Sequence, residues 1–171
     1  EKGLTGKGFE FLAEMERMHM IVDVSHLSDK GFWDIVEHGT RPFAASHSNC
    51  RALAPHTRNL TDEMIRALSE RGGIAGLNYY APFLDTDPTH PENCRSTVEL
   101  IAKHAAHYKQ VGGAQMIALG SDFDGIDGPH QLENAAFLPL LADALRKEGF
   151  TEDEVEGIYY RNAMRFFEEN L

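Results

Sequence analysis

Short apolar runs alternate along the chain with longer stretches in which apolar residues recur at helical spacing. The runs at 20–26, 42–47, 74–79 and 115–121 are typical of parallel strands buried on both faces. A helical pattern follows each run, and another one, over residues 8–18, precedes the first. This alternation predicts an α/β protein with a parallel sheet and right-handed crossovers.

The expected helices carry capping signals at their ends. Ser28 and Thr61 stand where N-cap residues are favoured, and Thr151 with Glu154 has the spacing of a capping box. Gly39 follows the helix that Ser28 begins, and a glycine there is typical of a helix C-terminus. These residues locate the helix ends more closely than hydrophobicity does.

Three of the expected strands end in side chains that can bind a metal ion or move a proton. The first strand ends at His26, the second at His47, and the fourth at Asp122. Loops at the C-terminal strand ends build the active sites of α/β barrels, and two imidazoles with a carboxylate suit zinc. The alternative is that the histidines cap core strands by hydrogen bonding alone.

Four βα units are half of the eight in a TIM barrel, which typically needs about 250 residues. The length of 171 residues predicts a single domain over residues 1–171. The sheet is therefore either open and four-stranded or half of a (β/α)₈ barrel. The chemistry at the strand ends favours the half barrel.

Other polar residues are weaker candidates for a site. Arg58 and Asn59 end the loop after the second strand, and the arginine fork suits a carboxylate or phosphate, although an ordinary surface arginine is the alternative. His56 in the same loop could also approach the site. His104 and His107 share a helical face with no acidic ligand beside them, so we interpret them as packing or surface residues.

The chain is acidic, with 16 Lys and Arg against 27 Asp and Glu and a formal net charge of −11. This balance argues against nucleic acid and anionic membranes as partners, because both bind basic surfaces. No apolar run approaches the ~20 residues of a membrane span and no signal peptide is visible, so we expect no membrane contact and a cytoplasmic location. The two cysteines are too few for a disulfide framework and leave a single Cys50–Cys94 bond open.

Seven short stretches of the chain carry a resemblance to a known family. They are Gly3-Leu4-Thr5, MIVDVSHLSD (20–29), ASHSN (45–49), RNLTDEMI (58–65), RGGIAGLNYY (71–80), LGSDFDG (119–125) and the closing EGFTEDEVEGIYYRNAMRFFE (148–168). In this order they resemble the membrane (renal) dipeptidase family of zinc metallopeptidases, which has an amidohydrolase-type TIM barrel. The resemblance covers nearly the whole chain, and the ordered set is specific although each piece alone is weak.

The resemblance implies roles for the residues at the strand ends. The family's fifth and sixth strands each end in a zinc-binding histidine, matched here by His26 and His47. A catalytic aspartate ends the eighth strand and is matched by Asp122. An arginine after the sixth strand binds the terminal carboxylate of the substrate, and Arg58 stands at that place, with Asn59 beside it as a further substrate-binding candidate.

The chain resembles the C-terminal half of such an enzyme, with βα units that correspond to strands 5–8. The family's His-x-Asp on strand 1 and its bridging glutamate on strand 4 have no counterpart, so at most one of two zinc sites is partly formed. We expect a zinc-dependent dipeptidase for dipeptides with a free carboxyl terminus, inactive or weakly active as a lone chain. We also expect self-association or pairing with an N-terminal half.

Two other functions stay open at this point. One is a non-catalytic remnant half-domain with a structural or binding role. The other is a related amide or lactam hydrolase with the same barrel.

Overall fold

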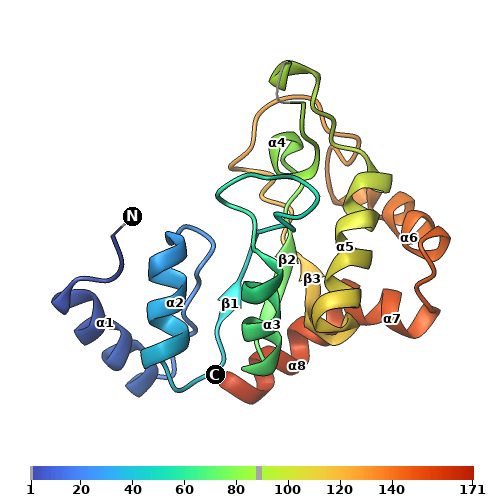
Figure 1. Cartoon of the computed structure of the whole chain (residues 1–171). Helices are drawn as coiled ribbons and strands as arrows, with labels where there is room; N and C mark the ends of the chain where they lie inside the picture. The colour runs from blue at the N-terminus through green and yellow to red at the C-terminus, as the bar shows by residue number, and fades with distance from the viewer. Residues whose placement is uncertain (1, 88–89) are drawn as a thin grey trace.

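Helices and strands alternate along the chain in the computed structural model, which describes residues 2–87 and 90–171 (Figure 1). Its sheet has three parallel strands in spatial order β1-β2-β3. These strands are β1 (Ala44–Ala45), β2 (Ile74–Leu77) and β3 (Ile117–Leu119). The register pairs Ala44 with Ile74 and Ala75 with Ile117. The predicted α/β class and parallel sheet are therefore confirmed.

The first predicted strand, 20–26, forms only an isolated parallel bridge between Asp23 and Ala44. The Val24 N–H donates to Ala44 O at 2.8 Å, and the Ala44 N–H donates to Val22 O at 2.9 Å. Within the described residues this segment has no strand on its other side, so it lacks the second ladder that holds a central strand straight. The sheet consequently has three strands where the hydrophobic pattern predicts four.

Helices connect and flank the strands. The α-helices are α1 (Gly6–Arg17), α2 (Asp29–His38), α3 (Asp62–Glu70), α4 (Ala81–Leu84), α5 (Val98–Gly112), α6 (Leu138–Lys147), α7 (Glu152–Glu156) and α8 (Asn162–Asn170). Short 3₁₀ turns are η1 (Pro91–Asn93), η2 (Ala114–Met116) and η3 (Ala135–Phe137), and η4 (Gly157–Arg161) is a π-helical turn. No helix in the described part of the chain has the length and apolar character needed to cross a bilayer.

The predicted capping residues begin and end their helices. The side-chain oxygens of Ser28, Thr61 and Thr151 each accept a hydrogen bond from the backbone N–H three residues later. Glu154 returns a bond to the Thr151 N–H, so the capping box is complete. Gly39 caps the end of α2. The caps satisfy N–H groups that the first turn of a helix leaves without partners.

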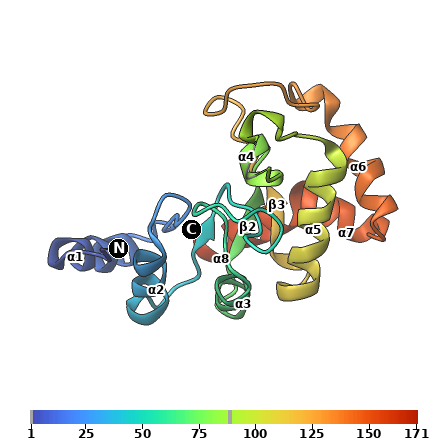
Figure 2. The ribbon, with the colours of Figure 1, turned by 45° about the horizontal axis from the view of Figure 1, so that its top comes forward.

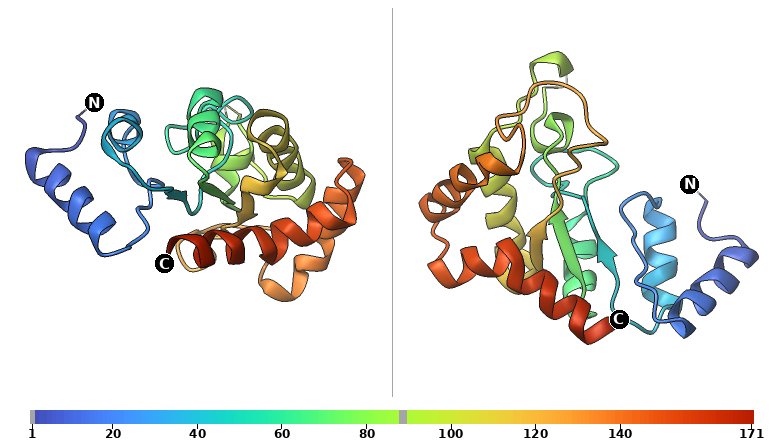
Figure 3. Two further views of the ribbon diagram at one scale, coloured as in Figure 1. Left: turned by 90° about the horizontal axis from the view of Figure 1, so that it is seen from below. Right: turned by 180° about the vertical axis from the view of Figure 1, so that it is seen from behind.

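The two faces of the sheet are covered differently. Figure 3 shows α3 and α5 on one face and α8 across the other. Leu77 and Ile117 point into the larger core, on the side of α3 and α5. Ile74 and Ala118 form a smaller cluster with Phe166 of α8. Figure 2 shows α1 and α2 at one end of the molecule, beyond β1. The edge of the sheet next to the bridged segment 20–26 therefore lies between these two helices and the main core.

Candidate active site at the C-terminal edge of the sheet

The two predicted histidines lie together beyond the C-terminal ends of their segments. The Nε2 atoms of His26 and His47 are 2.9 Å apart, and the ring centroids are 4.9 Å apart. His26 is exposed and His47 is half-buried. Partial burial lowers the pKa of His47 below its ordinary value, while Asp122 and Asp23 oppose this shift. The neutral imidazole that results is the form that binds a metal ion.

The other ring nitrogen of His47 is tied to a serine and a carboxylate. The His47 Nδ1 lies 2.7 Å from Ser46 Oγ, and Ser46 Oγ donates to Asp23 Oδ2 at 2.5 Å. The second oxygen of Asp23 accepts from the backbone N–H groups of Ser46 and Ser25 at 3.0 and 3.1 Å. Burial alone would raise the pKa of the Asp23 carboxyl, but these hydrogen bonds outweigh it, so the pKa lies below its ordinary value.

Asp122 is held at the same edge by a residue that sequence reasoning missed. Asn78, at the end of the third predicted strand, donates from Nδ2 to Asp122 Oδ2 at 3.0 Å. The same Nδ2 lies 3.5 Å from His47 O, a longer contact that brings the two loops together. Asp122 has φ of 67°, a conformation that only a few non-glycine residues adopt. A polar residue ending an apolar run is the signal that singled out His26, and Asn78 has it too.

Two glycines, Gly76 and Gly120, allow the chain that follows β1 to pass close to the backbone of β2 and of the residue after β3. A Cβ added to Gly76 would lie 1.9 Å from Ser46 O, and one added to Gly120 would lie 2.0 Å from it. Any side chain at these positions would push the Ser46 backbone away. The glycines therefore let His47 approach the end of β3.

Arg58 lies beside His47 and Asp122 and has a donor without a partner. Its Nε donates to Ser25 O at 2.6 Å, and its guanidinium carbon lies 5.3 Å from the centroid of the Phe83 ring. The Nη2 atom is buried and has no hydrogen-bond partner among the described residues. Burial lowers the pKa of Arg58, and the nearby carboxylates of Asp122 and Asp23 oppose the shift. A buried cationic donor without a partner is costly unless an anion completes it.

The predicted neighbour of Arg58 points away from the site. Asn59 is fully buried, donates to Ala54 O at 2.8 Å and to Phe83 O at 2.9 Å, and accepts from the Asn49 N–H at 3.2 Å. All of these partners are backbone groups of the surrounding loops. Substrate binding by Asn59 stays a prediction that this placement does not favour.

The remaining histidines of interest lie outside the cluster. His56 accepts the Arg58 N–H at Nδ1 (3.1 Å), and its ring lies 4.6 Å from the Phe83 ring, so it supports the arginine loop. His104 is buried, and His107 pairs with Asp62 at 2.7 Å. The burial of His104 fits a packing role, whereas His107 has an acidic partner that the sequence pattern did not predict. Both cysteines are free, so the Cys50–Cys94 bond is not formed.

The ligand set is incomplete in the described part of the chain, where no group of three or more His, Cys, Asp and Glu side chains could hold a metal ion. The pair His26 and His47 is one ligand short of the three protein ligands usual in a catalytic zinc site. The facing Nε2 atoms and the His47 Nδ1, which Ser46 links to Asp23, nevertheless fit a metal ion, because metal-binding histidines commonly donate their other ring N–H to a carboxylate or another acceptor.

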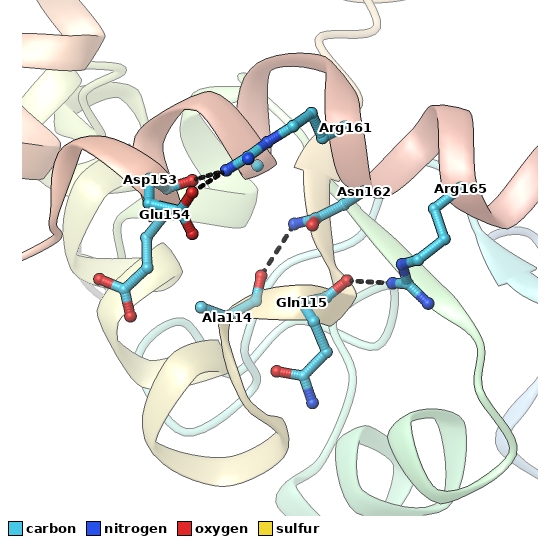
Figure 4. Close-up of a pocket in the computed structure, with 8 residues that line it drawn as sticks. Ala114, Gln115, Asp153, Glu154, Arg161, Asn162 and Arg165 are labelled. Carbon is cyan, nitrogen blue, oxygen red and sulfur yellow. Dashed lines mark hydrogen bonds and ion pairs between the residues drawn. The ribbon is translucent and has the colours of Figure 1, made fainter.

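A hollow of about 510 Å³ lies at the other end of β3 (Figure 4). Its charged side chains and Asn162 already have partners within the fold. Arg161 Nη2 pairs with Asp153 Oδ1 at 2.6 Å, and Arg165 Nη2 donates to Gln115 O at 2.9 Å. Since these groups hold α7, η4 and α8 to the strand, we do not assign a reaction to this hollow.

A parallel sheet with polar side chains gathered at its C-terminal edge has the arrangement in which α/β barrel enzymes hold their active sites. The model of the membrane dipeptidase family (peptidase family M19) matches residues 1–170, and the chain belongs to this family.

Curated relatives match along almost the whole chain. An uncharacterized protein encoded in the pqqA 5′ region of Klebsiella pneumoniae is 38% identical over 95% of this chain and 59% of its own length. An uncharacterized dipeptidase of Schizosaccharomyces pombe is 34% identical over 96% of this chain and 39% of its own length. The dipeptidase tcpJ of Claviceps purpurea is 33% identical over 98% and 38%. The chain thus spans roughly half the length of the relatives it matches.

Solved structures agree with this relation. A metallopeptidase of Rhodobacter sphaeroides, bound to a phosphinate mimic of the dipeptide L-Ala-D-Ala, superposes with a TM-score of 0.91 at 32% identity, over 100% of this chain and 48% of that one. An amidohydrolase of Pseudomonas aeruginosa superposes with a TM-score of 0.84 at 25% identity, over 98% and 58%.

Proposed function

We propose that this chain is the C-terminal half of a zinc-dependent dipeptidase barrel and forms a single domain over residues 1–171. The three strands and the bridged segment 20–26 would then correspond to strands 5–8 of a TIM barrel, with 20–26 straightened by a strand of the other half. The observation that carries the proposal is the convergence of two imidazole Nε2 atoms, 2.9 Å apart, at the edge that also holds Asp122 and Arg58.

His26 and His47 would hold one zinc ion, and the second ion of the family would require ligands outside these residues. A bound zinc ion lowers the pKa of water and polarises a carbonyl group. The partial burial of His47 favours its neutral form, and its Nδ1 contact leaves Nε2 available. These properties support metal binding by the pair.

Asp122 would act as the general base and then as the general acid. Its carboxylate would accept a proton from the attacking water and pass it to the leaving amine of the dipeptide. The amide of Asn78 holds one carboxylate oxygen at 3.0 Å, which leaves the other oxygen for the proton. Asn78 is thus a positioning residue for Asp122.

Arg58 would bind the free carboxylate of the dipeptide. The unpartnered Nη2 provides the donor, and Nε fixes the guanidinium by its bond to Ser25 O. Asn59 would contribute by holding the loop rather than by touching substrate, since its amide is used by backbone groups. The dipeptide mimic bound by the Rhodobacter sphaeroides relative supports this substrate class.

The lone chain would be weakly active or inactive, because two histidines do not complete a catalytic zinc site. Pairing with an N-terminal half, or self-association, would supply what is missing. The roughly half coverage of the relatives and the exposed apolar side chains of η4 and α8 support this expectation. A non-catalytic remnant is the second candidate, and the two-ligand set is the observation that favours it. A related amide or lactam hydrolase is a third and weaker candidate, which the similarity to an amidohydrolase supports.

The function is tested by hydrolysis of an unblocked dipeptide by the chain with added zinc, at high protein concentration and in single-turnover mode. Residual hydrolysis should fall at least about a hundredfold in Asp122→Asn, because general acid–base catalysis contributes on that order. Asp124→Asn, an exposed acid in the same loop, is the matched control. Measurable hydrolysis that proceeds at equal rates in the original chain and Asp122→Asn would contradict the role of Asp122. Turnover of about 10 s⁻¹, a typical enzyme rate, would contradict the need for a second half.

A further inference from the structure

A continuous hydrogen-bonded row joins Asp23 to the pair of histidines. Asp23 Oδ2 lies 2.5 Å from Ser46 Oγ, Ser46 Oγ lies 2.7 Å from His47 Nδ1, and His47 Nε2 lies 2.9 Å from His26 Nε2. These groups come from two segments that bridge each other in parallel, Asp23 preceding His26 and Ser46 preceding His47. None of the roles assigned above uses Asp23 or Ser46.

The protons in this row can be counted. An ionised carboxylate only accepts hydrogen bonds, so the single hydroxyl proton of Ser46 is donated to Asp23. The Ser46 oxygen then has only lone pairs for His47 and must accept a proton from Nδ1. A neutral imidazole carries one N–H, and therefore Nε2 of His47 is an unprotonated lone pair directed at His26.

We propose that Asp23, acting through the hydroxyl of Ser46, is a positioning residue that fixes the Nδ1–H tautomer of His47 and so keeps Nε2 open for a metal ion. The link to the metal rests on the function proposed above. The tautomer itself does not, because it follows from hydrogen-bond partners within the chain. Acceptors that orient a metal-binding histidine in this way typically change metal affinity 10–100-fold when they are removed.

The backbone hydrogen bonds of Asp23 determine how an asparagine would be oriented in its place. Its Oδ1 accepts the N–H groups of both Ser25 and Ser46, so only an oxygen fits there. In Asp23→Asn the amide oxygen must keep that place, and the amide nitrogen must take the place of Oδ2. The nitrogen then donates to Ser46 Oγ, and the hydroxyl proton turns to His47 Nδ1. Donation of that proton to Nδ1 favours the Nε2–H tautomer of His47, in which the atom facing His26 no longer presents a lone pair to a metal ion.

The test is a ¹⁵N–¹H correlation spectrum of the histidine rings in the metal-free chain at neutral pH, which reports the tautomer directly. The original chain should show His47 as Nδ1–H, and Asp23→Asn should show it as Nε2–H. Asp34→Asn is the matched control, because Asp34 is likewise a carboxylate that accepts a backbone N–H, from Leu4 at 2.7 Å, but it lies in α2 away from the site. His47 should stay Nδ1–H in this control.

A zinc titration with a competing chromophoric chelator completes the experiment. Zinc affinity should fall at least tenfold in Asp23→Asn and stay unchanged in Asp34→Asn. Ser46→Ala provides a second route if Asp23→Asn does not fold, since it removes the connection while leaving Asp23 in place. It should weaken zinc binding and remove the preference for Nδ1–H.

The two proposals fail in different ways. A His47 ring that is Nε2–H in the original chain, or Nδ1–H in both the original chain and Asp23→Asn, overturns the positioning role whatever zinc does. A tautomer that reverses as expected in a chain with no measurable zinc affinity overturns the metal site while the effect of Asp23 on His47 stands.

Discussion

At the scale of single residues, His104 is the clearest case of a histidine kept neutral by its surroundings. Its Nδ1 accepts the Cys50 N–H at 3.0 Å and its Nε2 donates to Leu84 O at 3.0 Å. Burial lowers the pKa of His104 to about 4, and the Leu84 bond only partly opposes this. Protonation would place a charge in the core and break the bond from Cys50.

We therefore predict that His104 makes the chain less stable as the pH falls. Its pKa is depressed on folding, so between about 6.5 and 4 the unfolded state binds more protons than the folded state, and the free energy of unfolding rises with pH. The contribution is fully present above the unfolded pKa and amounts to roughly 3 kcal/mol at most. Urea unfolding at several pH values measures it.

The matched comparison for this prediction uses two substitutions to asparagine. His104→Asn keeps an acceptor for Cys50 and should flatten the slope of stability between pH 6.5 and 4. His38→Asn, at an exposed position in α2, should leave the slope unchanged. An unaltered slope in His104→Asn would contradict the assignment.

At the scale of elements, the close approach of Ser46, just after β1, to β2 depends on the missing side chain of Gly76. An alanine there would place its Cβ 1.9 Å from the backbone oxygen of Ser46, which cannot move without disturbing His47. We predict that Gly76→Ala lowers the free energy of unfolding by about 3 kcal/mol, the upper part of the range for overpacking. Chemical denaturation measures it, and Gly6→Ala, where a Cβ meets nothing within 4 Å, should show no loss.

The cap of α7 gives a second prediction at this scale. Thr151 Oγ1 accepts the Glu154 N–H at 3.2 Å, and Glu154 accepts the Thr151 N–H at 2.8 Å. Thr151→Ala should cost about 1 kcal/mol of stability, as expected for an N-cap. Thr57→Ala, at an exposed loop position, is the control, and an equal loss in both variants would show that the cap contributes nothing specific.

The elements also show what the sequence could and could not predict. Helix ends follow from local side chains such as Ser28 and Thr61, and these predictions are confirmed. Strand length depends on neighbours far along the chain, so the reduction of 20–26 to one bridge was not predictable from its hydrophobic pattern. Asn78 was missed because a single amide at a strand end has many ordinary uses, and only the contact with Asp122 distinguishes it.

At the scale of the whole molecule, the chain leaves an apolar stripe without cover. Tyr160, Met164 and Phe167 lie at helical spacing on η4 and α8, and Leu171 follows α8 at the same spacing. The exposed fractions of these four side chains range from 46% to 73%. Isolated apolar side chains are normal on a protein surface, but a contiguous stripe marks a contact surface. The stripe is where we expect a second copy or the other half of the barrel to pack.

We predict that the chain self-associates at micromolar concentration and that Phe167→Lys weakens this association. The substitution replaces an exposed apolar side chain, so it should shift the sedimentation velocity profile toward monomer without unfolding the chain. Glu168→Gln, at an exposed position on the same helix but outside the stripe, changes the net charge by the same +1 and should change association less. A monodisperse monomer of the original chain would contradict the expectation.

The central claim is that His26 and His47 together form a metal site. Equilibrium dialysis of zinc against the chain, His26→Ala, His47→Ala and the control His38→Ala tests it most directly. The account predicts that zinc binds to the original chain and to His38→Ala, and that binding is lost in both His26→Ala and His47→Ala. Equal zinc binding by all four proteins would contradict it.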